Sequence, residues 1–147
     1  MGRCTGPLLE TYLATYGWTY RNTGVDEWRT GFQGQERSFP LRISLTETWI
    51  AFQIEPYLGL EIDWESWPEI ARCLLELNGR SSMVRLSLCD QGRIEMGLEV
   101  LNKQFCYESF CTCVGLLGFY ADQFYDEILG RLDSIGFRYT ESLKLLT

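Results

Sequence analysis

Six cysteines and a run of closely spaced acids are the side chains of this chain that could carry chemistry. No cysteine pair has C-x-x-C spacing, and the C-x4-C-x-C spacing that ends at Cys113 is a poor match to structural zinc sites. The chain has no histidine, which removes Ser-His-Asp and Cys-His catalysis, His-ligated metals and the usual general base near neutral pH. We therefore predict structural roles for the cysteines: Cys4, Cys73, Cys89, Cys106, Cys111 and Cys113.

The acids Glu61, Asp63 and Glu65 alternate in a way that imitates the start of an EF-hand loop. The sixth position of such a loop needs glycine and is Ser66 here, and the twelfth needs glutamate and is Arg72. Calcium binding is therefore not expected, and no glycine-rich nucleotide motif occurs. An enzyme would need Cys, Tyr or carboxylate chemistry without histidine. We predict a protein with no catalytic residue, no metal and no cofactor.

The negative charge of the chain is concentrated after residue 45. Net charge is −7, of which residues 46–147 carry −8, and six acids lie between Glu55 and Glu76 with only Arg72 among them. Because nucleic acid binding normally requires a basic patch that displaces counterions, a nucleic acid partner is not expected. A basic protein partner fits this charge. A solvated face that keeps the protein soluble is the alternative explanation.

Trp64 and Trp67 lie among these acids, at the start of an expected helix. Tryptophan is enriched at the centres of protein interfaces because it offers a large apolar area and one N–H donor. Core filling explains Trp67 equally well, whereas the neighbours of Trp64, Asp63 and Glu65, favour water. The sequence predicts a partner-binding site made of Trp64, Trp67, Glu61, Asp63 and Glu65.

The expected helix spans Ser66 to Asn78. Ser66 and Glu69 have the spacing of a capping box, Pro68 suits the first turn, and Asn78 with Gly79 suits a left-handed stop. Apolar residues at spacings of three and four predict two more helices, and alternating residues predict five strands. The other expected elements are helices Pro7–Tyr16 and Tyr107–Ile135, and strands Asp26–Gln33, Phe39–Leu45, Trp49–Glu55, Met83–Leu88 and Ile94–Val100.

These elements predict a two-layer α+β fold, a five-stranded antiparallel sheet covered by helices in the order α-β-β-β-α-β-β-α. Pro40 indicates an edge strand or a strand start. Within the long helix, Gly115 and Gly118 suggest close packing against another backbone, either the sheet or a second subunit.

The chain is expected to be a single domain over residues 1–147, with a core at about 7–135 and a short tail at 137–147. No run approaches the length of a membrane span, and the first residues lack the apolar stretch of a secretory signal. A cytoplasmic location is therefore expected.

Five segments carry a recognisable pattern of apolar positions: WRTGFQGQ, WIAFQIEPYL, LLELN, MVRLSLCDQGRIEMGLEV and FCTCVGLLGFYADQFYDEIL. The chain resembles the YbjN family of bacterial proteins in these segments, in the helix end at Leu77-Asn78 and in the turn at Asp90 to Gly92. Members of this family are also called proposed sensory transduction regulators. The resemblance covers about residues 8–132. That family in turn resembles type III secretion chaperones in fold, with the same order of elements.

Type III secretion chaperones are small, acidic, non-enzymatic and usually dimeric, and they bind extended segments of client proteins. The resemblance therefore implies a chaperone-like or adaptor protein that binds an unidentified protein partner and forms a homodimer. The alternative hypothesis is a small-molecule sensor with a pocket between sheet and helices, lined by Trp28, Trp49 or Tyr120.

Overall fold

A computed structural model of the chain describes residues 2–59, 61–89 and 92–136. Two of the predictions, the turn at residues 90–91 and the tail at 137–147, lie outside the described residues. The helices are α1 (Gly6–Tyr16), α2 (Trp67–Arg80) and α3 (Tyr107–Ser134), with a short 3-10 helix η1 (Trp64–Ser66) before α2. The strands are β1 (Tyr20–Gly24), β2 (Glu27–Gln33), β3 (Ser38–Leu45), β4 (Trp49–Leu58), β5 (Arg85–Leu88) and β6 (Ile94–Leu101).

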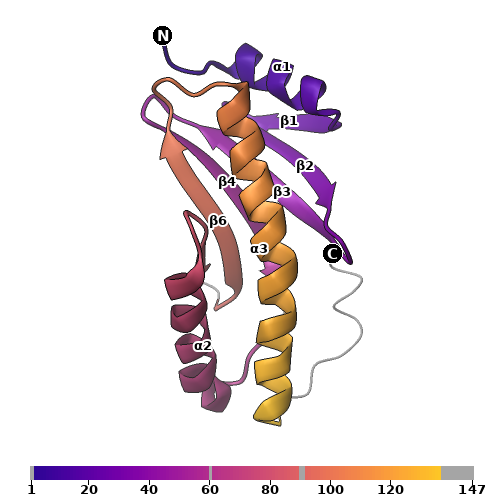
Figure 1. Ribbon diagram of the computed structural model, residues 1–147, viewed down its shortest axis with the longest axis vertical. Coiled ribbons are helices and arrows are strands. Elements are labelled where there is room, and N and C mark those ends of the chain that lie inside the picture. Colours follow the sequence, from indigo (N-terminus) through magenta and orange to yellow (C-terminus); the bar gives the residue numbers. More distant parts are fainter. Residues whose placement is uncertain (1, 60, 90–91, 137–147) are drawn as a thin grey trace.

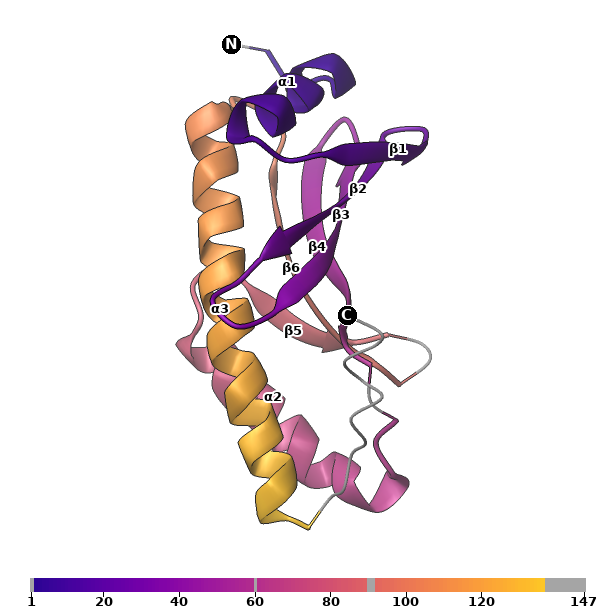
Figure 2. The same cartoon turned by 90° about the vertical axis from the view of Figure 1, so that its right-hand side faces the viewer.

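The strands form one antiparallel sheet in the order β1-β2-β3-β4-β6-β5 (Figure 1). Helix α3 runs along one face of the sheet, α1 lies at one end of the molecule, and α2 lies at the other (Figure 2). The predicted α+β class with an antiparallel sheet is confirmed. None of the described helices is long and apolar enough to cross a membrane.

The expected count of five strands is wrong, because the sheet has six and the chain forms four strands before α2. Sequence analysis did not predict β1, which pairs with β2 in the sheet. A turn at Val25 and Asp26 connects the two strands, and Asp26 has a φ of 55° in this turn. Four of its five residues are exposed, so the strand lacks the alternation of apolar and polar residues on which the prediction depended. Pro40 lies near the start of β3, an interior strand, and so marks a strand start rather than an edge.

The core lies between α3 and the inward side chains of the strands. Phe110 and Phe124 of α3 are fully buried, as is Phe52 of β4, and the hydroxyl of buried Tyr57 donates a 2.6 Å hydrogen bond to the Ala121 carbonyl. The predicted helical stripe is confirmed, and α3 continues without interruption through its glycines.

Gly115 and Gly118 of α3 do not show the close backbone packing against the sheet that was one of the two expectations. A Cβ built on Gly115 has no other atom within 4 Å, and one on Gly118 lies at 3.6 Å from the Phe32 ring, an ordinary contact. Packing of α3 against the sheet therefore does not require glycine at either position. Contact of these glycines with a second subunit stays a prediction.

The expected capping box at the start of α2 is also wrong. The Ser66 side chain makes no cap hydrogen bond, since its hydroxyl donates to Asp63 Oδ1 at 2.6 Å. Glu69 does not reach back to Ser66 either, because its carboxylate accepts a 2.8 Å hydrogen bond from Arg131 of α3. The helix begins at Trp67, and Pro68 in its first turn costs no intrahelical bond.

Helix α2 continues past the expected stop at Asn78 and ends at Arg80. The Asn78 amide serves the neighbouring strand instead: its Nδ2 donates to the Leu86 carbonyl at 3.0 Å, and its Oδ1 accepts from the Leu86 N–H at 2.7 Å. These groups lie on the outer edge of β5, an edge strand, and unpaired edge groups invite pairing with other chains. One side chain thus closes part of this sheet edge.

Candidate protein-binding site

The predicted site lies on the segment between β4 and α2, where the chain forms η1. Ile62 is 9% exposed and anchors the segment in the core, while the Ser66 N–H donates to the Asp63 carbonyl at 3.0 Å and closes the turn. The turn leaves Trp64 projecting into solvent with 88% of its surface exposed. The exposed anchor predicted from the acidic neighbours of Trp64 is therefore present in the structure.

The three predicted acids surround this tryptophan. Glu61, Asp63 and Glu65 are exposed, and none of them forms an ion pair with another described residue. These carboxylates therefore have no cation beside them among the described residues, although Asp63 Oδ1 accepts the Ser66 hydroxyl. We define the Trp64 turn as residues Glu61, Asp63, Trp64 and Glu65.

Trp67, the fifth predicted residue, has a different environment. It is half-buried and packs against the hydrophobic core at the first residue of α2. Core filling, which was the alternative explanation for this residue, thus accounts for part of its surface. The structure brings all five predicted residues into one segment, but the apolar surface offered to solvent belongs chiefly to Trp64.

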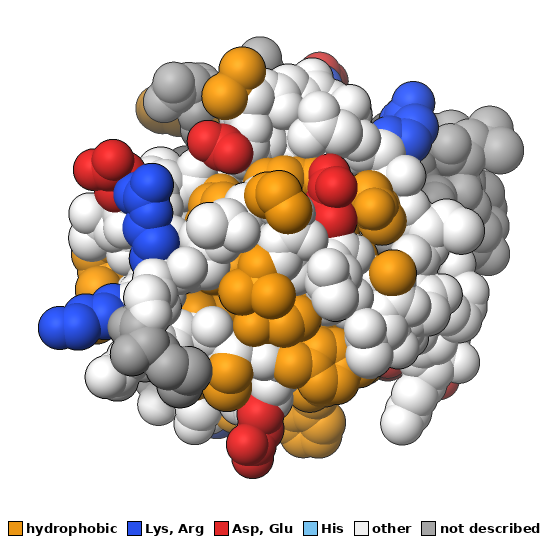
Figure 3. Space-filling model, turned by 90° about the horizontal axis from the view of Figure 1, so that it is seen from above, with side chains coloured by type: hydrophobic (Ala, Val, Ile, Leu, Met, Phe, Trp, Pro, Cys, Tyr) orange, Lys and Arg blue, Asp and Glu red, His pale blue; other side chains and the backbone are white. Residues whose placement is uncertain are grey.

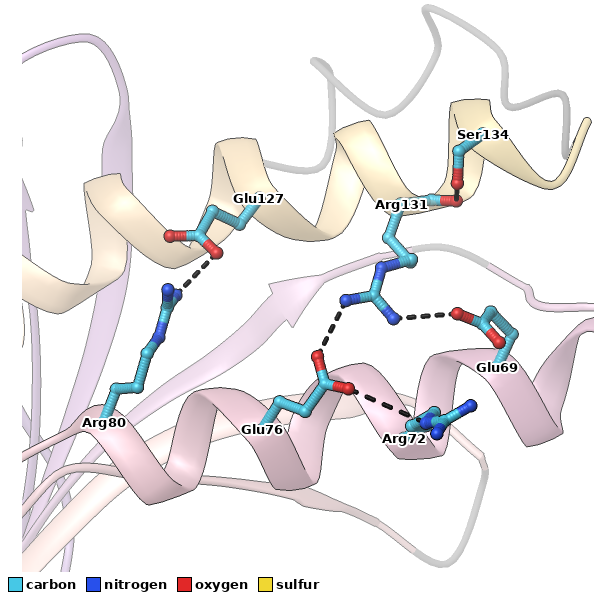
Figure 4. A network of polar contacts seen from close by, with 7 residues as sticks. All are labelled: Glu69, Arg72, Glu76, Arg80, Glu127, Arg131 and Ser134. Carbon is cyan, nitrogen blue, oxygen red and sulfur yellow. Dashed lines mark hydrogen bonds and ion pairs between the residues drawn. The ribbon is translucent and has the colours of Figure 1, made fainter.

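Ion pairs fix the base of the turn. Arg131 of α3 donates to Glu69 and to Glu76 of α2, at 2.8 Å each, and Arg72 lies 3.7 Å from Glu76 (Figure 4). The hydrogen bond from Arg131 lowers the pKa of Glu76, and these two acids raise the pKa of the arginine. Further along the same helix pair, Arg80 binds a glutamate of α3 at 2.5 Å.

These contacts join α2, from its first turn to its last residue, to the second half of α3, at the end of the molecule away from α1 (Figure 1). Sequence reasoning did not foresee them because they join residues 62 and 55 positions apart. The consequence for the site is that the Trp64 turn is carried on a braced helix rather than on a free loop.

The residues proposed for a ligand pocket have different environments. Trp28 is 2% exposed and donates its Nε1–H to Glu10 at 2.8 Å, whereas Trp49 is 44% exposed at the start of β4. Two surface hollows, of about 410 and 460 Å³, are lined by other residues, and Tyr120 lines neither. Neither of these two hollows is therefore the pocket that was expected beside Trp28, Trp49 or Tyr120.

A second apolar surface, which the sequence did not predict, lies at the opposite end of the molecule. Seen from the end that carries α1, hydrophobic side chains gather across the middle of the face (Figure 3). Of the apolar residues that recur at helical spacing along α1, Leu8 and Tyr16 are 37% and 39% exposed, whereas Leu9 and Leu13 are buried. The helical period correctly predicted α1 but overestimated the width of its buried face.

The cysteines are unpaired and differ in environment. Burial raises the pKa of both Cys4 and Cys113 to about 11. Half-exposed Cys106 precedes α3, and hydrogen bonds from the Ser109 hydroxyl and backbone N–H lower the pKa of its thiol. Within the described parts of the chain, no three His, Cys, Asp or Glu side chains are arranged to hold a metal ion.

Comparison with protein-family models gives no match, and comparison with curated protein sequences gives none either. Solved structures do match. The crystal structure of YbjN, a proposed transcription regulator from E. coli, has a TM-score of 0.57 at 14% sequence identity, over 93% of this chain and 97% of that chain.

A chain of the heterodimeric ExoU-SpcU complex from the type III secretion system of Pseudomonas aeruginosa has a TM-score of 0.54 at 18% identity, over 79% of this chain and 93% of that chain. At such identities the likeness concerns the fold. The chain therefore has a YbjN-like fold, which is shared with a chain of a complex from the type III secretion system, as the resemblance in sequence implied.

Proposed function

We propose that the chain is a cytoplasmic, non-enzymatic, chaperone-like or adaptor protein that binds a protein partner through the Trp64 turn. One observation carries the proposal: Trp64 is 88% exposed on a braced turn, beside three acids that form no ion pair with another described residue. An exposed tryptophan of this kind leaves a large apolar surface in water, and burial against a partner removes that surface from water. The likeness in fold to a chain of a heterodimeric complex supports the proposal.

The charge of the turn specifies the kind of partner. An apolar anchor within an acidic rim is complementary to an apolar pocket or ridge bordered by Lys or Arg. The exposed carboxylates would act mainly on the rate of association, and salt screens such charges over about 8 Å at physiological ionic strength. Binding should therefore weaken in high salt, while the apolar contact with Trp64 persists.

The experiment is affinity capture from a lysate of the source organism at low and at high salt, with proteins identified by mass spectrometry. Three baits are compared: the wild-type chain, Trp64→Ala, and Trp49→Ala as a matched loss of tryptophan at the opposite end of β4. We expect a stoichiometric protein that Trp49→Ala retains and Trp64→Ala loses. A partner retained equally by all three baits, or no stoichiometric partner, contradicts the proposal.

We also propose that the chain forms a homodimer. Leu75 of α2 and Phe119 of α3 are 72% and 61% exposed, and they give the helices apolar surface outside the Trp64 turn. An open helix face beside Gly115 would allow a second copy to approach closely. Sedimentation equilibrium should give twice the chain mass of 17.1 kDa, and a monomer mass at micromolar concentration contradicts the homodimer.

A further inference from the structure

No described helix covers the face of the sheet opposite α3 (Figure 2). Along β3 and β4, buried inward residues alternate with half-buried residues that point to this open face. Arg42 is one of the residues on the open face, since it lies between buried Leu41 and Ile43. Side chains on this face are therefore free of the core and can serve another purpose.

The register of the sheet places three arginines side by side on the open face. Arg21 of β1 pairs with Arg29 of β2, and Arg29 pairs with Arg42 of β3. Directly opposed residues of neighbouring strands have Cβ atoms about 4.5–5.5 Å apart, so like charges at these positions repel. Such a row needs compensating negative charge.

Among the described residues, ion pairs compensate the charge of one of the three arginines. Arg42 lies 2.8 Å from Glu55 and 3.7 Å from Glu27, and it donates to Gln53 at 2.8 Å. Arg21 and Arg29 form no ion pair with any residue in the described part of the chain. In a chain with a net charge of −7, two neighbouring guanidinium groups thus have no carboxylate partner among the residues that the structure describes.

A hollow of about 460 Å³ lies beside these two arginines, and both line it. Gly31 and Pro40, which pair across β2 and β3, also line the hollow. A Cβ built on Gly31 would lie 3.5 Å from the Phe39 carbonyl, an ordinary contact, so the backbone does not demand glycine there. The missing side chain leaves space next to the guanidinium groups.

We propose that Arg21 and Arg29 bind the phosphate group of a phosphomonoester ligand in this hollow. A phosphomonoester carries a charge of about −1.5 to −2 at pH 7, which matches two guanidinium groups, whereas one carboxylate would leave a positive charge. Each guanidinium presents a planar fork of N–H donors that suits two phosphate oxygens. This site is on a different segment from the Trp64 turn and does not depend on the proposed partner.

The test is a two-dimensional NMR titration of the backbone amide and arginine Nε–H signals with inorganic phosphate and with phenyl phosphate, at constant ionic strength. We expect saturable shifts confined to β1, β2 and the start of β3. The double variant Arg21→Gln/Arg29→Gln should weaken binding at least tenfold, and Gly31→Val should weaken it by filling the hollow. Arg85→Gln, which removes a paired arginine from the same face, should change the affinity less than twofold.

Two further probes decide the chemistry. Dimethyl phosphate, a monoanionic diester, should bind at least tenfold more weakly than phenyl phosphate. A phosphoserine peptide that binds more tightly than phenyl phosphate would identify a phosphorylated protein as the source of the group, and equal affinity would identify a small phosphomonoester. Absence of saturable shifts, shifts that survive in the double variant, or equal binding of dimethyl phosphate overturns the proposal.

Discussion

Replacement of Trp64 by alanine tests whether this side chain is exposed to solvent or buried in the core. Trp64 is 88% exposed, so folding removes only about an eighth of its surface from water. A tryptophan can bury at most roughly 250 Å², so the covered part is about 30 Å², and at about 25 cal/mol per Å² its loss costs about 0.7 kcal/mol of folding free energy. A buried tryptophan in the core would cost about 3–5 kcal/mol instead.

The assay is urea unfolding of Trp64→Ala, followed by circular dichroism, with Trp28→Ala as the control. Trp28 is 2% exposed and its indole N–H is hydrogen-bonded, so this variant should lose about 3–5 kcal/mol. For Trp64→Ala we expect an unchanged slope and a midpoint lowered by less than about 0.7 M, given slopes of about 1–3 kcal/mol/M. A loss of 2 kcal/mol or more would show that Trp64 belongs to the core and would refute the proposed site.

Three other substitutions test contacts elsewhere in the fold. Asn102 is 1% exposed and pairs a backbone N–H near the N-terminus with a carbonyl of the β3–β4 turn, so Asn102→Ala should lose about 1–3 kcal/mol in urea unfolding, and a neutral result contradicts this role. Arg131 lowers the pKa of Glu76, so this carboxylate stabilises the fold above its unfolded pKa and the contribution is lost as pH falls below about 4.5. Melting temperatures at low salt should therefore fall more steeply with acid for wild type than for Arg131→Gln, and parallel curves would refute the link. Because its pKa is lowered, the Cys106 thiol should react first with iodoacetamide at neutral pH, and Cys106→Ser should remove the fast phase, as measured by mass spectrometry.

Elements with a strong hydrophobic period could be predicted from the sequence alone. The apolar stripe of α3 and the apolar alternation of β6 consist of side chains that face the core. The pattern of apolar residues in the sequence therefore matches the pattern of buried residues in the structure. Strand β1 could not be predicted in this way, because its side chains are mostly exposed. Backbone pairing with β2, rather than burial of side chains, makes this segment a strand. The turn residues from Thr23 to Asp26 were the available signal for that hairpin.

Local rules failed where a distant residue competed for the same side chain. Glu69 has the right spacing to cap α2, but Arg131, 62 positions away, takes its carboxylate. Asn78 has the right type for a helix stop, but its amide bonds to β5 instead. The prediction for Trp64 succeeded because this side chain is exposed to water, and the acids beside it in the sequence indicated this exposure.

The arginine pair shows the opposite case. Arg21 and Arg29 are unremarkable in the sequence, and only the register of β1 on β2 places them side by side. Because the sequence analysis did not predict β1, it could not predict this cluster. A site that depends on strand register becomes visible only with the sheet.

The affinity of the purified partner for the Trp64→Ala variant is the most direct test of the proposed function. Isothermal titration of the captured partner into wild type and variant would give both dissociation constants at the same salt concentration. If Trp64 is the central anchor, its loss should cost at least about 2 kcal/mol, which is roughly a thirtyfold weaker Kd. A Kd within about threefold of wild type, with unchanged stability, would show that the partner binds elsewhere and that the Trp64 turn is not the interface.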